Sequence, residues 1–174
     1  MSQEISKKGK AAFEAGNFPQ ADSLFLEAQQ SYEQSGDKLM AAEMKNNRCV
    51  ALLQMDRAEE ALEIVTNTDL LFEQAGDKNR QAIALSNQAS ALEALDRYPE
   101  AIEKYQQASD LLKELNEKEM RAYVLKSLAA LQLKTGEQLQ SLATMQAALE
   151  SKKKLSLREK FLKRLLKVPF KMMH

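Results

Sequence analysis

The sequence predicts an all-α protein, a right-handed α-solenoid of about four helix pairs followed by a C-terminal amphipathic helix. The first observation is a repeat with a period of forty residues, at which Ala21, Ala61 and Ala101 align without gaps. The second is composition: five glycines, three prolines and no tryptophan suit helices better than sheet or disorder. A repeat this regular predicts stacked units, which usually present a binding surface.

Composition and charge restrict the class of protein further. The chain of 174 residues has no net charge, yet residues 1–150 carry 16 Lys/Arg against 24 Asp/Glu. Residues 151–174 carry nine Lys/Arg and one acid, Glu159. The single Cys49 excludes an internal disulfide and a cysteine zinc site. We see neither a secretory signal nor an apolar stretch long enough to span a bilayer, so we expect a cytoplasmic protein that could sit peripherally at a membrane.

Repeat one covers residues 2–38 and repeat two covers residues 39–78. Pro19 suits the first turn of the second helix, where its missing N–H is not needed. Gly36 can adopt the left-handed C-terminal conformation, and Asp37 can cap the helix that follows. Residues 66–68 (Thr-Asn-Thr) are weak helix formers inside the second helix of repeat two, and we expect packing to override that preference.

Repeat three, residues 79–118, is the cleanest copy, and Asp96 with Pro99 marks the turn between its helices. Repeat four, residues 119–155, keeps the register but departs from the pattern. It has Gln132 and Gln138 at positions for large apolar residues and Ser141 in place of the central alanine. We therefore expect looser packing in this unit.

A different segment begins at Ser156. Ser156 and Glu159 match a capping box, in which each side chain bonds the other residue's backbone N–H. We expect a basic amphipathic helix over residues 156–168, because Pro169 cannot continue it, and then a tail at 169–174. The apolar face of the helix holds Leu157, Phe161, Leu162, Leu165, Leu166 and Val168. The opposite face holds Lys160, Lys163, Arg164 and Lys167.

Small and large residues alternate at fixed positions in each unit. Repeat three carries the pattern as Ala89, Leu92, Tyr98, Ala101, Tyr105 and Ala108. Repeat one carries it as Gly9, Ala12, Phe18, Ala21, Phe25 and Ala28. The sequence thus resembles the tetratricopeptide repeat family over roughly residues 2–150. The period of 40 instead of the usual 34 is similar to that of a long-repeat subgroup found in adaptor and scaffold proteins.

The resemblance implies that the first helix of each unit lines a concave groove that holds a peptide segment of a partner protein. Its groove positions fall here on Lys10, Asn46, Asn47, Ser86, Asn87, Ser90 and Lys126. Asn47 and Asn87 occupy the same position in consecutive units. An amide can pair with both groups of a peptide backbone, although these side chains could instead bond to neighbouring helices or to water. The family's clamp for a terminal carboxylate is not expected, because only Asn47 matches its pattern.

Catalysis finds little support in the sequence. The only histidine is His174, at a terminus where fraying is expected, and Cys49 occupies a small-residue packing position. We therefore expect a non-catalytic adaptor or scaffold with no cofactor and no metal. We also expect no nucleic-acid binding, since the body of the chain is acidic.

The basic C-terminal segment leaves three interpretations open. Leu157, Phe161 and Leu165 could cap the exposed face of repeat four. The helix could instead lie on an anionic membrane surface, acting as a peripheral membrane recruiter. It could also fold back on the acidic body or on another copy of the chain, giving self-association. The residues that would contact a membrane or partner are Phe161, Lys163, Arg164, Leu165, Lys167 and Phe170.

Overall fold

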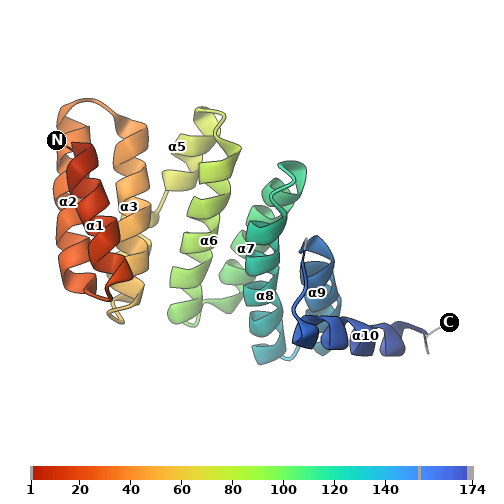
Figure 1. Cartoon of the computed structure of the whole chain (residues 1–174). Helices are drawn as coiled ribbons and strands as arrows, with labels where there is room; N and C mark the ends of the chain where they lie inside the picture. The colour runs from red at the N-terminus through yellow and green to blue at the C-terminus, as the bar shows by residue number, and fades with distance from the viewer. Residues whose placement is uncertain (1, 153, 172–174) are drawn as a thin grey trace. The chain divides into compact units, whose positions relative to one another are not determined.

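The computed structural model describes the backbone of residues 2–152 and 154–171 and, in the last helix, side chains up to Leu166. This part of the chain forms ten helices and no strand, which confirms the predicted all-α repeat fold (Figure 1). The helices divide between two compact units, residues 1–104 and 105–174, with the boundary inside α7. In chain order they are α1 (Ser2–Glu14), α2 (Phe18–Gln34), α3 (Lys38–Leu53), α4 (Ala58–Val65), α5 (Thr68–Gln74), α6 (Lys78–Ala94), α7 (Tyr98–Glu114), α8 (Lys118–Lys134), α9 (Gln138–Ser151) and α10 (Leu157–Lys171).

One turn geometry recurs every twenty residues and sets the length of the helices. A residue with φ between 56° and 86° stands at each of seven equally spaced positions: Gly16, Gly36, Asp56, Gly76, Asp96, Asn116 and Gly136. Glycine adopts this conformation without strain, and Asn and Asp tolerate it better than other residues do. The residue after each of them donates its N–H to a carbonyl five residues back, the Schellman arrangement that ends a helix.

Asp37 shows how one residue both ends a helix and starts the next. Its N–H donates to the Tyr32 carbonyl at 2.9 Å, closing α2, and its carboxylate accepts from the Met40 N–H at 3.0 Å, opening α3. The predicted left-handed Gly36 and the predicted cap at Asp37 are both confirmed. These local interactions explain why the helices break at the same place in each unit.

Small residues let the helices of residues 1–104 approach closely. Ala21, Ala61 and Ala101, the three aligned alanines, are all fully buried. Gly9 of α1 lies against the ring of Phe25 in α2, so closely that a β-carbon at position 9 would be 2.7 Å from Phe25 Cε1. The small residue on one helix and the large residue on the next therefore form a complementary pair, as the repeat pattern predicted.

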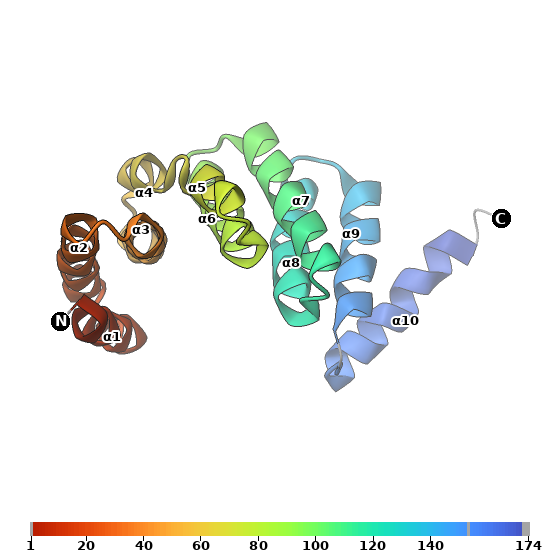
Figure 2. The same cartoon turned by 90° about the horizontal axis from the view of Figure 1, so that it is seen from above.

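The second helix of repeat two is broken, contrary to the expectation that packing would keep it continuous. α4 ends at Val65, Asn67 has φ 62°, and α5 begins at Thr68 (Figure 2). Thr68 is 1% exposed, and its hydroxyl donates to the Val65 carbonyl at 2.7 Å. Gln88 of α6 donates to the same carbonyl at 3.1 Å. The break persists because side chains satisfy the backbone group that it leaves free, so local propensity prevails.

In residues 105–174, α8 and α9 pack against each other. The hydroxyl of Ser141, which replaces the usual alanine, donates to the Ala129 carbonyl at 2.7 Å, so the substitution is accommodated by a hydrogen bond. Gln132 occupies a core position at 4% exposure, and its Oε1 is buried without a partner among the described residues. This unit therefore contains polar groups where the repeat pattern calls for apolar ones.

The capping box at the start of α10 is confirmed. The Glu159 N–H donates to Ser156 Oγ at 3.3 Å, and the Ser156 N–H donates to Glu159 Oε2 at 3.0 Å. The helix continues to Lys171, three residues beyond the predicted end at Val168, and its backbone passes through Pro169. Proline removes one backbone hydrogen bond, a loss that bends a helix without always ending it. Of the predicted tail, residues 172–174 lie outside the described residues.

Candidate functional site

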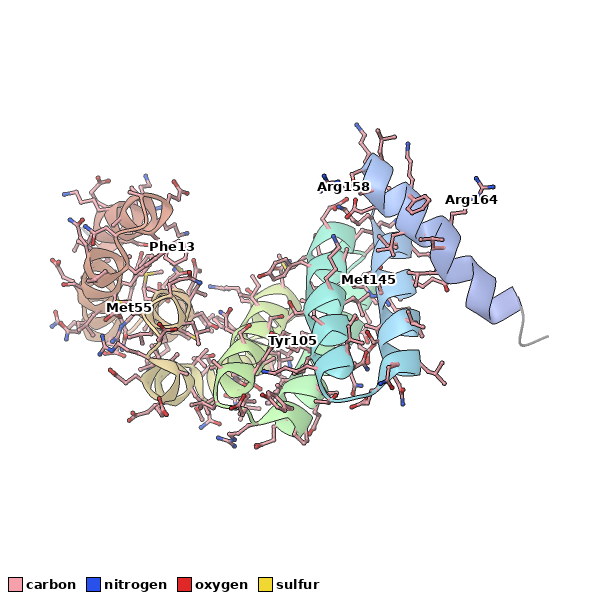
Figure 3. All side chains as sticks on the ribbon, turned by 90° about the horizontal axis from the view of Figure 1, so that it is seen from below. Phe13, Met55, Tyr105, Met145, Arg158 and Arg164 are labelled. Atoms are coloured by element: carbon pink, nitrogen blue, oxygen red, sulfur yellow. The ribbon has the colours of Figure 1, made fainter. Side chains whose placement is uncertain are left out.

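Two neighbouring cavities in residues 1–104 are lined largely by the first helices of the repeats. The first, of about 260 Å³, is lined mainly by α1 and α3 and includes Phe13, labelled in Figure 3, and Val50. The second, of about 270 Å³, is lined by α1, α3, α5 and α6. Lys10 and Asn47 line both, so the two cavities form a single surface, which we call the α1–α3 groove.

The first cavity is apolar at its base. Phe25 of α2, 2% exposed, is the most buried residue of its lining, and Phe13 stacks edge-on against Phe18 with ring centroids 5.3 Å apart. This part of the groove can take an apolar side chain.

The second cavity carries an ordered set of charges. Glu43 lies between two cations, with Oε1 3.9 Å from Lys10 Nζ and Oε2 3.5 Å from Arg80 Nη1. Arg80 is held further by Asp77, at 2.7 Å, and its guanidinium lies 5.1 Å from the centre of the Phe72 ring. The Arg80 N–H bond to Asp77 lowers the pKa of that carboxyl, so it stays ionised. Two cations and one acid line the cavity itself, and Asp77, which is not part of the lining, also pairs with Arg80.

The predicted groove asparagines have different roles. Asn46 is 3% exposed; its Nδ2 donates to the Ala42 carbonyl at 2.9 Å and to Thr68 Oγ1 at 3.2 Å. Asn87 donates to Asn46 Oδ1 at 3.0 Å. Asn47 Nδ2, by contrast, is buried without a partner among the described residues. Asn46 and Asn87 thus hold helices together, whereas the Nδ2 donor of Asn47 makes no hydrogen bond within the described residues.

The other predicted groove residues are also engaged within the protein. Ser86 and Ser90 donate to carbonyls of their own helix, at 2.9 Å and 3.0 Å. Lys126 lies in the other unit and donates to Glu159 of α10 at 2.7 Å. Of the seven predicted positions, Lys10, Asn46 and Asn47 line the α1–α3 groove.

Sequence reasoning missed the contributions of Phe13, Phe72 and Arg80. A signal for Arg80 was present: in the forty-residue register it stands where the neighbouring units have Met40 and Met120. Its role depends on α5 bringing Phe72 beneath it, which follows from the break in the second helix of repeat two.

Of the α10 side chains predicted to contact a membrane or partner, Phe161, Arg164 and Leu165 are exposed. Leu157 is 84% exposed, Phe161 65% and Leu165 50%, so these three side chains do not cover repeat four as the first of the three interpretations requires. They fail to cover it because Leu166, on another side of the helix, is the side chain that becomes buried, at 6%. Arg164 (Figure 3) is exposed and Lys163 is partly exposed. The side chains of Lys167 and Phe170 lie outside the described residues.

Glu159 fixes the start of α10. Its carboxylate accepts from Lys126 at 2.7 Å, from the Ser156 N–H at 3.0 Å and from Lys152 at 2.9 Å. These donors hold the pKa of Glu159 well below its usual range, so the carboxylate stays charged in the folded protein. The helix is therefore attached at its first turn by polar contacts, while its apolar stripe remains uncovered.

Two further findings concern metals and membranes. Within the described residues, no group of three or more His, Cys, Asp or Glu side chains is arranged to hold a metal ion. In the same part of the chain, no helix has both the length and the apolar character required to cross a bilayer.

The sequence matches the tetratricopeptide repeat over residues 39–114 and again over residues 80–154. The chain belongs to the tetratricopeptide repeat family. Such repeats generally mediate protein–protein interaction and are typically non-catalytic scaffolds. A comparison with curated proteins found no significant match.

A solved structure supports the fold. The crystal structure of BtubC (BKLC) from P. vanneervenii is similar with a TM-score of 0.77 and 17% sequence identity, over 94% of this chain and 70% of that one. At this identity the likeness concerns the fold alone. The forty-residue tetratricopeptide repeat unit, predicted from the sequence, is consistent with both comparisons.

Proposed function

We propose that this tetratricopeptide repeat protein is a non-catalytic adaptor that binds an extended segment of a partner protein in the α1–α3 groove. The observation that carries the proposal is Asn47, whose buried Nδ2 has no partner among the described residues and which lines both cavities. A buried donor without an acceptor is unfavourable, and a peptide carbonyl in the groove would satisfy it.

The two cavities suggest what the segment carries. An apolar side chain would fit the first cavity, over Phe13 and Val50. A carboxylate would suit the second, where Lys10 and Arg80 now share Glu43. We therefore expect an extended segment with a bulky apolar residue and an acidic residue a short distance apart.

A displayed library of short random peptides tests this proposal. Selection on the wild-type chain should enrich sequences that combine an apolar and an acidic residue. Their affinity should fall about tenfold in Asn47→Ala, as expected for one lost hydrogen bond to a buried donor. Gln30→Ala, an exposed amide on α2, is the matched control and should leave affinity unchanged. Peptides that bind Asn47→Ala as well as wild type would contradict the proposal.

A second candidate function rests on the exposed stripe of α10. Leu157, Phe161 and Leu165 lie four residues apart and so on one side of the helix, flanked by basic residues. This is the pattern of a helix that lies in the plane of an anionic bilayer. We infer that α10 could recruit the protein to such a surface.

Co-sedimentation with vesicles tests the second candidate. The full chain should pellet with vesicles rich in phosphatidylserine, and the 1–155 truncation should not. Phe161→Asn removes an apolar side chain of the stripe without removing a charge and should reduce pelleting. Arg158→Gln removes one positive charge of the same helix and is the variant with which it is compared. If the full chain stays in solution with these vesicles, membrane recruitment is excluded. Light scattering of the same protein preparations without vesicles reports self-association through the stripe.

A further inference from the structure

A third cavity, in residues 105–174, has no role in the functions proposed above. It has a volume of about 280 Å³ and lies where the end of α7, the start of α8 and the end of α9 come together. Lys113, Lys118 and Arg121 line it, against a single acid, Glu150. The lining thus carries an excess of positive charge in a chain whose first 150 residues are acidic.

Arg121 lines this cavity, and not all of its N–H groups are used within the described residues. Its Nη1 donates to Ser151 Oγ at 2.9 Å. Its Nε is buried and has no hydrogen-bond partner among the described residues. Nε and Nη2 form the edge of a guanidinium that offers two parallel N–H groups to an oxyanion. Ser151 is itself fixed, because its hydroxyl donates to the Ala147 carbonyl at 2.9 Å. In the described part of the chain, the guanidinium of Arg121 is therefore bonded through Nη1 alone.

Two of the three cations in this cavity, Lys113 and Arg121, are not a general property of the repeat. At the position of Lys113 the earlier units have Glu33 and Glu73, and at the position of Arg121 they have Ala41 and Gln81. Lys118, by contrast, has a lysine at both equivalent positions. A lysine in the last turn of α7 is favoured by the helix dipole, but a cation in the first turns of α8 is not. An anion bound between them would offset that unfavourable placement.

We propose that this cavity binds a phosphate group, with the guanidinium of Arg121 as the main donor and Lys113 and Lys118 as supporting charges. Glu150 does not fill the site, because its carboxylate accepts from Gln146 at 3.0 Å and no ion pair joins it to a cation in the described part of the chain. A phosphate dianion matches the excess of positive charge better than a carboxylate does. The group would be borne either by a free phosphate compound or by a phosphorylated side chain of a partner.

NMR of arginine Nε–H groups tests the site directly on the full chain. Titration with inorganic phosphate should shift the Arg121 Nε–H signal with saturation, and a short blocked phosphoserine peptide should do the same. Tighter binding of the peptide would indicate a phosphorylated partner, and tighter binding of inorganic phosphate a free compound. Sodium chloride at matched ionic strength should produce no saturable shift. Equal effects of chloride and phosphate, or no saturation with either phosphate ligand, would overturn the proposal.

Variants separate a binding role from a structural one. Lys113→Gln, at an exposed position, and Arg121→Gln should each weaken phosphate binding, the latter by about tenfold or more, as expected for a charge-assisted bidentate contact. Glu150→Gln should strengthen it about two- to fivefold, because it removes the acid facing the ligand. Arg97→Gln, in the turn before α7, is the matched control and should have no effect. If Lys113→Gln and Glu150→Gln both leave the affinity unchanged, the cavity is not a phosphate site.

Discussion

The neighbouring residues Asn46 and Asn47 should respond differently to substitution by alanine. The amide of Asn46 makes three hydrogen bonds, to Ala42, Thr68 and Asn87, and the residue is 3% exposed. At about 0.5–1.5 kcal/mol for each bond, and with polar groups left buried, Asn46→Ala should lower the free energy of unfolding by about 2–4 kcal/mol. The loss should fall on the junction where α5 meets α3 and α6.

Asn47→Ala should have no such effect. Its Nδ2 makes no hydrogen bond in the described structure, and alanine favours the helix more than asparagine does. The free energy of unfolding should therefore stay the same or rise by up to about 0.5 kcal/mol. Urea unfolding followed by far-ultraviolet circular dichroism measures both variants. A change below about 0.5 kcal/mol for Asn46→Ala, or a loss above about 1 kcal/mol for Asn47→Ala, would refute the assignment of structural and binding roles.

Three further predictions concern the core and α10. Ala101→Leu should destabilise the chain by about 1–3 kcal/mol, because a fully buried position is overpacked; an unchanged melting temperature would show that the repeat register is wrong. Burial raises the pKa of the Cys49 thiol to about 12, so an alkylating reagent at pH 8 should modify it only after unfolding, and rapid native labelling would contradict its burial. Hydrogen bonds from Lys126, the Ser156 N–H and Lys152 lower the pKa of Glu159. The stability that Glu159 provides should therefore be fully present above its ordinary pKa of about 4.5 and be lost as pH falls toward the folded value. The difference in melting temperature between wild type and Glu159→Gln should shrink below that pH, and a difference independent of pH would contradict the ion-pair role.

Features set by local chemistry could be predicted from the sequence. The left-handed conformation of Gly36 and the helix cap at Asp37 were predicted correctly. Both depend only on neighbouring residues and need no information from distant parts of the chain. The same holds for the capping box of Ser156 and Glu159. The aligned alanines indicated the register of the forty-residue repeat, since each of them must lie where two helices approach closely.

Features that depend on distant side chains could not be predicted. The break before Thr68 is stable because Gln88, on another helix, donates to the Val65 carbonyl that the break leaves free, and Asn46 donates to the Thr68 hydroxyl. The sequence also does not reveal which face of α10 is buried: Leu166 turns inward while Phe161 stays exposed. In the α1–α3 groove, the asparagines were found by the repeat pattern, but only packing distinguishes a bonded amide from a free one.

Photo-crosslinking tests the proposed peptide groove most directly. A photoreactive amino acid placed at Val50, which lines the first cavity, should crosslink to a selected peptide, and the same group at the exposed Gln30 should not. Adding Asn47→Ala to the Val50 probe should reduce the crosslink in line with the loss of affinity. Efficient crosslinking from position 30, or a signal from position 50 that Asn47→Ala leaves unchanged, would show that the partner binds elsewhere.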